Sequence, residues 1–142
     1  MLPFNETSLP YAETLANLHK LCFDKPWDKA AFESLLFLPT TRGFVNDVAF
    51  VLFSVCADQA EILTLGVVPD ARKKGIAFDL LNYSIEQLKN SGVHEIFLDV
   101  NVKNLAARRL YEKADFRQVA VRKAYYEESG LKYDALVLKK IL

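Results

Sequence analysis

The sequence predicts a single α/β domain in which helices pack on a mixed β-sheet. The first observation is the order of elements, which runs from two helical stretches to two adjacent strands and then through helix, strand, helix and two final strands. The second is that 51% of the 142 residues are hydrophobic, which is enough for one core but leaves little for another. We therefore expect residues 1–142 to form one domain.

Two helices are expected at the start of the chain. Residues 7–23 carry apolar side chains at mixed spacings of three and four, as one buried helix face requires. Asp28 stands where an N-cap would, before a second apolar stretch that contains Phe32 and Leu35. The sequence PTTRG at residues 39–43 is expected to stop that second helix.

The hydrophobic period changes after Gly43. Residues 48–56 and 61–68 are rich in β-branched and aromatic side chains, with a short polar connection between them. We expect two antiparallel strands here. Their nearly continuous apolar character predicts burial on both faces.

The rest of the chain alternates between helix and strand. Residues 75–90 place their apolar side chains on one stripe, and Gly92 is a suitable end for that helix. The following elements are expected as a strand at 94–101, a short helix at 104–113, and two strands at 116–122 and 133–140.

Charge and cysteine content narrow the possible partners and compartments. Eighteen basic residues balance eighteen acidic ones, so no overall field would draw the protein to nucleic acid or an anionic membrane. Cys22 and Cys56 show no paired spacing, and the N-terminal stretch has no basic region followed by an apolar block. We expect a reduced protein in the cytoplasm, as a monomer or weak dimer, with no nucleic acid or membrane partner.

An anion site is predicted at residues 67–77, with the sequence VVPDARKKGIA. A strand that ends here and a helix that begins near Gly75 would direct several free backbone N–H groups at one point. Gly75 and Ala77 allow a ligand to approach the backbone, and three adjacent cations add positive charge: Arg72, Lys73 and Lys74. Pyrophosphate would suit this loop, although a scaffold that binds only phosphate fits the same residues. Walker and dinucleotide glycine patterns are absent from the sequence.

The stretch from Arg72 to Ala77, RKKGIA, resembles the acetyl-CoA pyrophosphate loop of the GNAT N-acetyltransferases. Four further blocks in the same order strengthen the resemblance: FDKPW from Phe23, EILTLGV from Glu61, FLDVNVKN from Phe97 and AARRLYEK from Ala106. These blocks, with RKAYY from Arg122, resemble the bacterial branch that acetylates the N-terminal alanine of a small-subunit ribosomal protein. The resemblance implies a mostly antiparallel sheet with a splayed parallel pair, about four flanking helices, and acetyl-CoA as cofactor.

The resemblance also implies residues that bind the coenzyme. It places the pyrophosphate on Arg72 to Ala77, which includes Ile76, and the Asn104 side chain on the cofactor. The strand residues Leu65, Gly66 and Val67 are expected beside it. Asn104 is also a suitable N-cap for its own helix, and that role is compatible with coenzyme contact.

Acetyl transfer from a thioester to an amine needs a proton acceptor and benefits from a donor. The resemblance implies Tyr111 as the donor beside the sulfur, although it could instead be an amphipathic core residue. Asp99 stands where the family branch has a glutamate as general base, so the resemblance implies that Asp99 takes this role. Its side chain is shorter by one methylene and would have to work through a water. Strand alternation supports a cleft-facing Asp99 on the side opposite Leu98. Glu61 is a second candidate base, or else a solvated acid at the end of its strand.

Other features leave the acceptor open. The turn from Phe23 to Trp27 and a loop at Tyr125 and Tyr126 could flank a slot for a peptide N-terminus, or Trp27 could be buried between the first two helices. Asp115 replaces the glycine that the family usually has at a left-handed helix end. His19 and His94 lie far apart without ligand spacing, so no metal is expected.

The sequence thus predicts direct acetyl transfer to an amine. The first choice of acceptor is the α-amine of a protein N-terminus, with a ribosomal protein as the candidate. Three alternatives remain: an enzyme for lysine or a small-molecule amine, a non-catalytic acyl-CoA-binding module, and the phosphate-binding scaffold.

Overall fold

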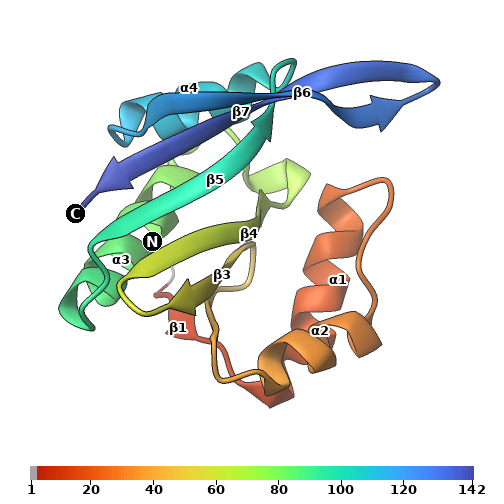
Figure 1. The fold of residues 1–142 in the computed structure, drawn as a ribbon. Coiled ribbons are helices and arrows are strands. Elements are labelled where there is room, and N and C mark those ends of the chain that lie inside the picture. The colour runs from red at the N-terminus through yellow and green to blue at the C-terminus, as the bar shows by residue number, and fades with distance from the viewer. Residues whose placement is uncertain (1–2) are drawn as a thin grey trace.

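A mixed β-sheet forms the centre of the molecule (Figure 1). The computed structural model describes residues 3–142. Its strands are β1 (Asn5–Glu6), β2 (Thr41–Val45), β3 (Ala49–Cys56), β4 (Gln59–Val67), β5 (Glu95–Asn101), β6 (Arg117–Glu128) and β7 (Leu131–Ile141). These seven described strands lie in the order β1-β2-β3-β4-β5-β7-β6, and every neighbouring pair is antiparallel except β4 and β5. The predicted mixed sheet, mostly antiparallel with one parallel pair, is confirmed.

Helices cover both faces of the sheet, as Figure 1 shows. The α-helices of the described chain are α1 (Ala12–Cys22), α2 (Lys29–Phe37), α3 (Ile76–Asn90) and α4 (Leu105–Lys113). Short 3₁₀ turns at Leu9–Tyr11 and Pro69–Ala71 precede α1 and α3. Helices α1 and α2 pack on one face, and α3 and α4 pack on the other.

The larger core lies between the sheet and α3. Leu80, Leu81 and Leu88 of α3 are fully buried in it, together with Phe53 and Ile96 from the strands. Burial of each such side chain contributes about 1.5–3 kcal/mol. The second core, on the α1 and α2 face, is smaller and buries Leu15, Phe32, Phe50 and Leu52.

The parallel pair separates soon after it forms. Strand β4 pairs with β5 only from Gln59–Glu95 to Glu61–Phe97. Beyond that point β4 keeps its partner β3 and β5 keeps its partner β7, so one edge of each strand is left open. The splayed parallel pair expected from the resemblance is therefore present, and it opens a gap in the middle of the sheet.

Local signals explain several element ends. The Asp28 side chain accepts a hydrogen bond from the Ala31 N–H at 2.9 Å, which confirms it as the N-cap of α2. Asp115 follows α4 with φ at 68°, the left-handed conformation that glycine adopts most easily. The aspartate in place of the family's usual glycine therefore stands in a strained position.

Some expectations about the first half of the chain were wrong. The helix expected over 7–23 is present, but its α-helical part is shorter than expected and runs from Ala12 to Cys22, after a 3₁₀ turn that contains Pro10. The stretch predicted only to stop α2 continues into strand β2 at Thr41. Burial on both faces holds for the first part of β3, whereas β4 mostly alternates between buried and half-buried positions.

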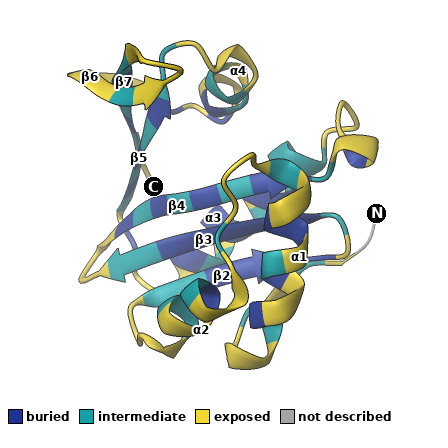
Figure 2. Cartoon of the chain, turned by 90° about the vertical axis from the view of Figure 1, so that its right-hand side faces the viewer, coloured by how far each residue is buried: buried dark blue, intermediate teal, exposed yellow. Residues whose placement is uncertain are grey.

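The C-terminal hairpin also differs from its expected form. Tyr125 and Tyr126 lie inside strand β6 rather than in a loop, because β6 extends to Glu128. Ala124, with φ at 51°, marks an irregularity in the pairing just before them. Figure 2 shows that β6 is exposed along nearly its whole length, as expected for the edge strand of the sheet.

Candidate active site

A cleft of about 1040 Å³ lies where β4 and β5 diverge. Its walls come from the second half of β4, the loop before α3, the second half of β5, and α4. Both strands are still hydrogen-bonded on their far sides, so the walls are rigid while the open edges face the cleft. A long ligand with amide groups could therefore hydrogen-bond to the free edges as a strand would.

The predicted anion loop forms one end of this cleft. Gly75 is the N-cap of α3 with φ at 79°, and it has no side chain to occupy the free N–H groups of the first turn. Arg72, Lys73 and Ala77 line the cleft with it, whereas Lys74 is not among the lining residues. Arg72 Nε donates to the Val67 carbonyl at 2.8 Å, which ties the loop to the end of β4. The free N–H groups at the start of α3 and the positive charges of Arg72 and Lys73 suit a diphosphate.

The end of β4 supplies the adjoining wall. Leu65, Gly66 and Val67 line the cleft and pair with β3 through their other edge. A Cβ at Gly66 would lie 2.7 Å from Phe50 Cζ and 3.1 Å from Cys22 Sγ. Only glycine therefore allows α1 to pack this close to the cleft strand.

Helix α4 presents Asn104 and Tyr111 to the cleft, and both line it. Asn104 Oδ1 accepts a hydrogen bond from the Ala107 N–H at 3.2 Å, which confirms its N-cap role. Tyr111 is 6% exposed and packs edge-on against Phe116. Burial, with a smaller contribution from Tyr126, raises the pKa of Tyr111 well above its ordinary value. The phenol therefore keeps its proton at physiological pH.

Asp99 lies in the cleft wall, and the expected alternation of β5 is confirmed. Leu98 packs into the core beneath α3, so Asp99 faces the α1 side of the sheet. Its carboxylate is 3.2 Å from Arg122 Nε of β6, and its side chain is 18% exposed. Burial, and then the charge of Asp99, raise the pKa of Tyr126, which also lines the cleft.

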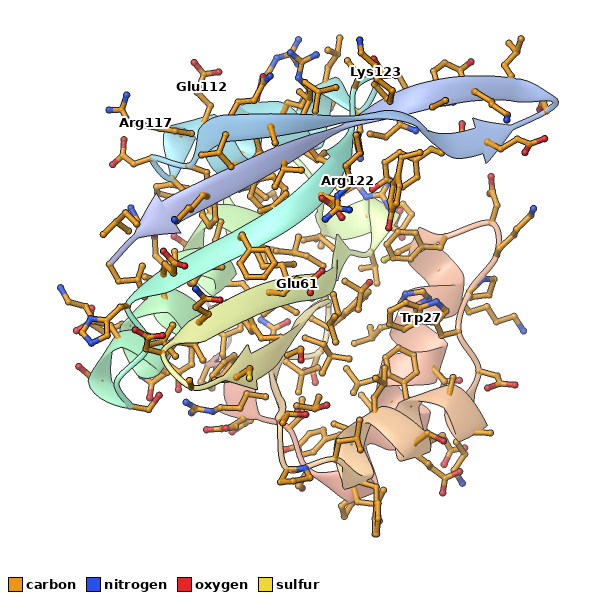
Figure 3. The ribbon with its side chains drawn as sticks, in the orientation of Figure 1. Trp27, Glu61, Glu112, Arg117, Arg122 and Lys123 are labelled. Carbon is orange, nitrogen blue, oxygen red and sulfur yellow. The ribbon has the colours of Figure 1, made fainter. Side chains whose placement is uncertain are left out.

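Glu61 stands apart from this group. It pairs with Phe97 in the last rung of the parallel ladder, just before the strands separate, and it is not among the cleft-lining residues. In Figure 3 the side chains of Glu61 and Arg122 both lie over the middle of the sheet, whereas Lys123 points away from it. The structure thus brings Asp99 and Tyr111 into the cleft but leaves Glu61 at its closed end.

Aromatic side chains surround the α1 side of the cleft. Phe23 and Tyr126 line it, and the ring centroids of Tyr125 and Tyr126 are 5.1 Å apart. Trp27 is half-buried and stacks on His19 at 5.0 Å, with Phe32 at 5.7 Å (Figure 3). Trp27 therefore packs between the first two helices, which is the structural alternative considered for it.

Three further residues at the site were not predicted. Thr64 lines the cleft and is hydrogen-bonded to His19, whose position in the sequence was weighed only for metal binding. Lys113 also lines it, with Nζ lying 4.2 Å from the centroid of the Phe78 ring. No local pattern marks these residues, because each contact joins different elements of the fold.

Two negative findings apply to residues 3–142. No group of three or more His, Cys, Asp or Glu side chains that could hold a metal ion is found there. Nor does any helix of that part have the length and apolar character needed to cross a membrane.

A split mixed sheet with a cleft at the split, and a basic, glycine-capped loop at one end of that cleft, is the arrangement expected of an acyltransferase. Residues 12–116 match the model of the Acetyltransferase (GNAT) family, so the chain belongs to that family. It is an N-acetyltransferase, and acetyl-CoA is its acetyl donor.

Individual relatives agree with the family assignment. A curated [ribosomal protein bS18]-alanine N-acetyltransferase of Escherichia coli strain K12 is 31% identical over 119 residues, covering 80% of this chain and 79% of that protein. The crystal structure of the ribosomal-protein-S18-alanine N-acetyltransferase from Escherichia coli superposes with a TM-score of 0.81 at 25% identity, over 98% of this chain and 94% of that one. Arabidopsis thaliana NAA60, crystallised with acetyl-CoA, shares the fold with a TM-score of 0.85 at 21% identity, over 100% and 99% of the two chains.

Proposed function

We propose that this enzyme acetylates the α-amine of a protein N-terminus, preferably one that begins with alanine, with a ribosomal protein as the candidate acceptor. The likeness to the Escherichia coli enzyme that acts on a ribosomal-protein alanine supports this acceptor class. One structural observation carries the catalytic part of the proposal: Asp99 and Tyr111 line the same cleft from opposite faces of the sheet.

The two faces divide the site into two halves. Tyr111 belongs to α4 and to the core on the α3 side, where the anion loop also lies. Asp99 faces the α1 side, where Phe23 and Tyr126 also line the cleft. The coenzyme would enter from the α3 side, and the acceptor amine from the α1 side.

Several residues would hold the coenzyme. The backbone N–H groups of Gly75, Ile76 and Ala77, with the charges of Arg72 and Lys73, suit its diphosphate. The open edge at Leu65, Gly66 and Val67 suits the amide groups of its arm, and Asn104 borders the same space. Bound there, acetyl-CoA supplies an activated acetyl thioester.

Proton transfer would then fall to two side chains. An α-amine has a pKa of about 8, so at neutral pH it must lose a proton before it can attack. Asp99 accepts that proton through a water, and Arg122 fixes the position of its carboxylate. Tyr111, which keeps its proton because it is buried, donates to the departing thiolate.

Acceptor peptides can test the proposal directly. The purified enzyme is incubated with labelled acetyl-CoA and peptides that begin with alanine, serine or methionine. Matched peptides carry a blocked N-terminus and one internal lysine, and a polyamine represents small-molecule acceptors. We expect label on the free N-terminus, with alanine preferred. Faster labelling of lysine or of the polyamine would contradict the proposed acceptor.

A further inference from the structure

His19 is a buried histidine that connects the α1–α2 loop to the cleft wall. It is 3% exposed and lies in the last turn of α1. The backbone N–H of Trp27 donates to its Nδ1 at 3.0 Å, and its Nε2 lies 3.1 Å from Thr64 Oγ1 on β4. The ring therefore bridges two segments that are 45 residues apart in the sequence.

These two contacts fix the tautomer of the ring. Because Nδ1 accepts a hydrogen bond from Trp27, it carries a lone pair and no proton. The ring proton is therefore on Nε2, which donates to Thr64 Oγ1. Burial lowers the pKa of His19, which favours this neutral form.

The direction of the Thr64 hydroxyl follows from the tautomer. Oγ1 accepts from His19, so its own hydrogen must point elsewhere. Within residues 3–142 no acceptor for that hydrogen is found, although Thr64 is only 8% exposed. Thr64 lines the cleft, so its O–H is a preoriented donor at the cleft wall.

The donor lies on the acceptor side of the cleft. Thr64 contacts α1 through His19, and Cys22 and Phe23 at the end of α1 line the cleft beside it. Asp99 faces the same side of the sheet, whereas Tyr111 belongs to the other core. A group bonded to Thr64 would thus belong to the acceptor rather than to the coenzyme diphosphate.

We propose that the Thr64 hydroxyl, oriented by His19, donates a hydrogen bond to the first carbonyl oxygen of the acceptor peptide. This inference rests on the proposed function. Every peptide α-amine has a carbonyl attached to the same Cα, whereas a lysine side-chain amine or a polyamine has none. The contact selects protein N-termini over other amines that could reach the same acetyl group.

The test compares two ligands on two enzymes. The first ligand is an alanine-starting peptide, and the second is the same peptide with its first carbonyl reduced to a methylene, used as a competitive inhibitor. Thr64→Val keeps the shape of the side chain and replaces the hydroxyl with a methyl group, which also removes the hydrogen-bond partner of His19 Nε2. We expect it to raise the KM of the normal peptide about tenfold, the size of one net hydrogen bond, and to leave the Ki of the reduced peptide within about twofold. Reduction also turns the first amide nitrogen into an amine. This change affects the Ki of the reduced peptide equally on both enzymes, so it does not alter the comparison between them.

Conservative variants separate orientation from folding. Thr64→Ser retains the hydroxyl and is expected to restore most of the peptide KM. His19→Gln retains a donor toward Thr64 and an acceptor for the Trp27 N–H, so the peptide KM is expected to stay within about threefold of the wild-type value. His19→Leu retains neither group, and it is expected to raise the peptide KM as much as Thr64→Val does. Thr41→Val, on β2 and outside the cleft lining, is the matched control and leaves KM unchanged. Thermal unfolding and acetyl-CoA affinity are measured for each variant.

The outcomes separate this inference from the proposed function. If Thr64→Val raises the KM of the normal peptide and the Ki of the reduced peptide equally, or changes neither, the carbonyl contact is wrong while N-terminal acetylation stands. A wild-type enzyme that acetylates no peptide N-terminus overturns the proposed function, and this inference with it.

Discussion

The Asp99 carboxylate is held 3.2 Å from Arg122 Nε, across the intervening strand β7. The candidate base is thereby fixed by the exposed edge strand of the sheet, while the guanidinium also lies 5.5 Å from the centroid of the Tyr125 ring. The C-terminal hairpin thus does more than cover the sheet edge: it positions a carboxylate in the cleft.

Replacement of Asp99 tests its role as proton acceptor. Asp99→Asn is expected to lower kcat/KM roughly 100-fold near pH 7. The loss should shrink as the pH rises above about 8, because the acceptor amine is then already neutral. The measurement is a pH–rate profile with an alanine-starting peptide, and an equal loss at every pH would indicate a positional role instead.

Tyr111→Phe tests the proton donor. It should lower kcat by about 10- to 100-fold with little change in the affinity for acetyl-CoA, because only the hydroxyl is lost. The raised pKa of Tyr111 means that the wild-type enzyme should lose no activity from phenol ionisation up to about pH 10. Unchanged turnover in the Phe variant across pH would remove Tyr111 from the mechanism.

The same tyrosine affects stability at high pH. An unfolded tyrosine ionises near pH 10, whereas the buried Tyr111 does so only at higher pH. Above pH 10 the unfolded state therefore binds fewer protons than the native state, and the free energy of unfolding falls as the pH rises. Tyr111→Phe should reduce that fall, as measured by denaturant unfolding at pH 8 and at pH 11. Equal pH dependence in both proteins would contradict the burial of the phenol.

Gly75 belongs to the loop that is proposed to bind the coenzyme. Gly75 and Gly92 both have positive φ, 79° and 100°, and a Cβ at either would meet no atom within 4 Å. Alanine at each should destabilise the fold by a similar ~1–2 kcal/mol. Only Gly75→Ala is expected to weaken coenzyme A binding as well, by up to about tenfold, because the strained loop can relax away from its binding conformation. Calorimetric titration checks this, and equal affinities for the two variants would contradict a diphosphate site at this loop.

Asp115 is a site where stability can be gained. Its φ of 68° strains an aspartate but not a glycine, so Asp115→Gly should stabilise the protein by about 0.5–1 kcal/mol. Asp115→Ala, which keeps a Cβ in the same conformation, is the control and should not stabilise. Both values come from denaturant unfolding curves, and a destabilised glycine variant would show that the aspartate side chain has a contact that outweighs the strain.

Local patterns in the sequence were sufficient for much of the fold. The Asp28 cap, the helix that starts at Gly75 and the alternation along β5 depend on neighbouring residues, and the structure confirms each of them. Strand β2 was missed because its sequence begins as a turn. Its Gly43 is in fact required by close packing, since a Cβ there would lie 2.4 Å from Leu52 Cδ2.

Only part of the candidate site could be predicted from the sequence. The anion loop is a continuous segment with its own charge and glycine pattern, so the pattern alone pointed to it. The pairing of His19 with Thr64 and of Asp99 with Arg122 joins residues from different elements, and no local spacing encodes either contact. The catalytic roles of Asp99, Glu61 and Tyr111 stay predictions.

A crystal structure of the enzyme with bound acetyl-CoA tests the central claim most directly. We predict the diphosphate on the backbone N–H groups at Gly75 to Ala77 and the thioester sulfur within hydrogen-bond reach of the Tyr111 hydroxyl, with Asp99 open to the acceptor side. A coenzyme bound elsewhere, or with its sulfur remote from Tyr111, would contradict the proposed arrangement of the site.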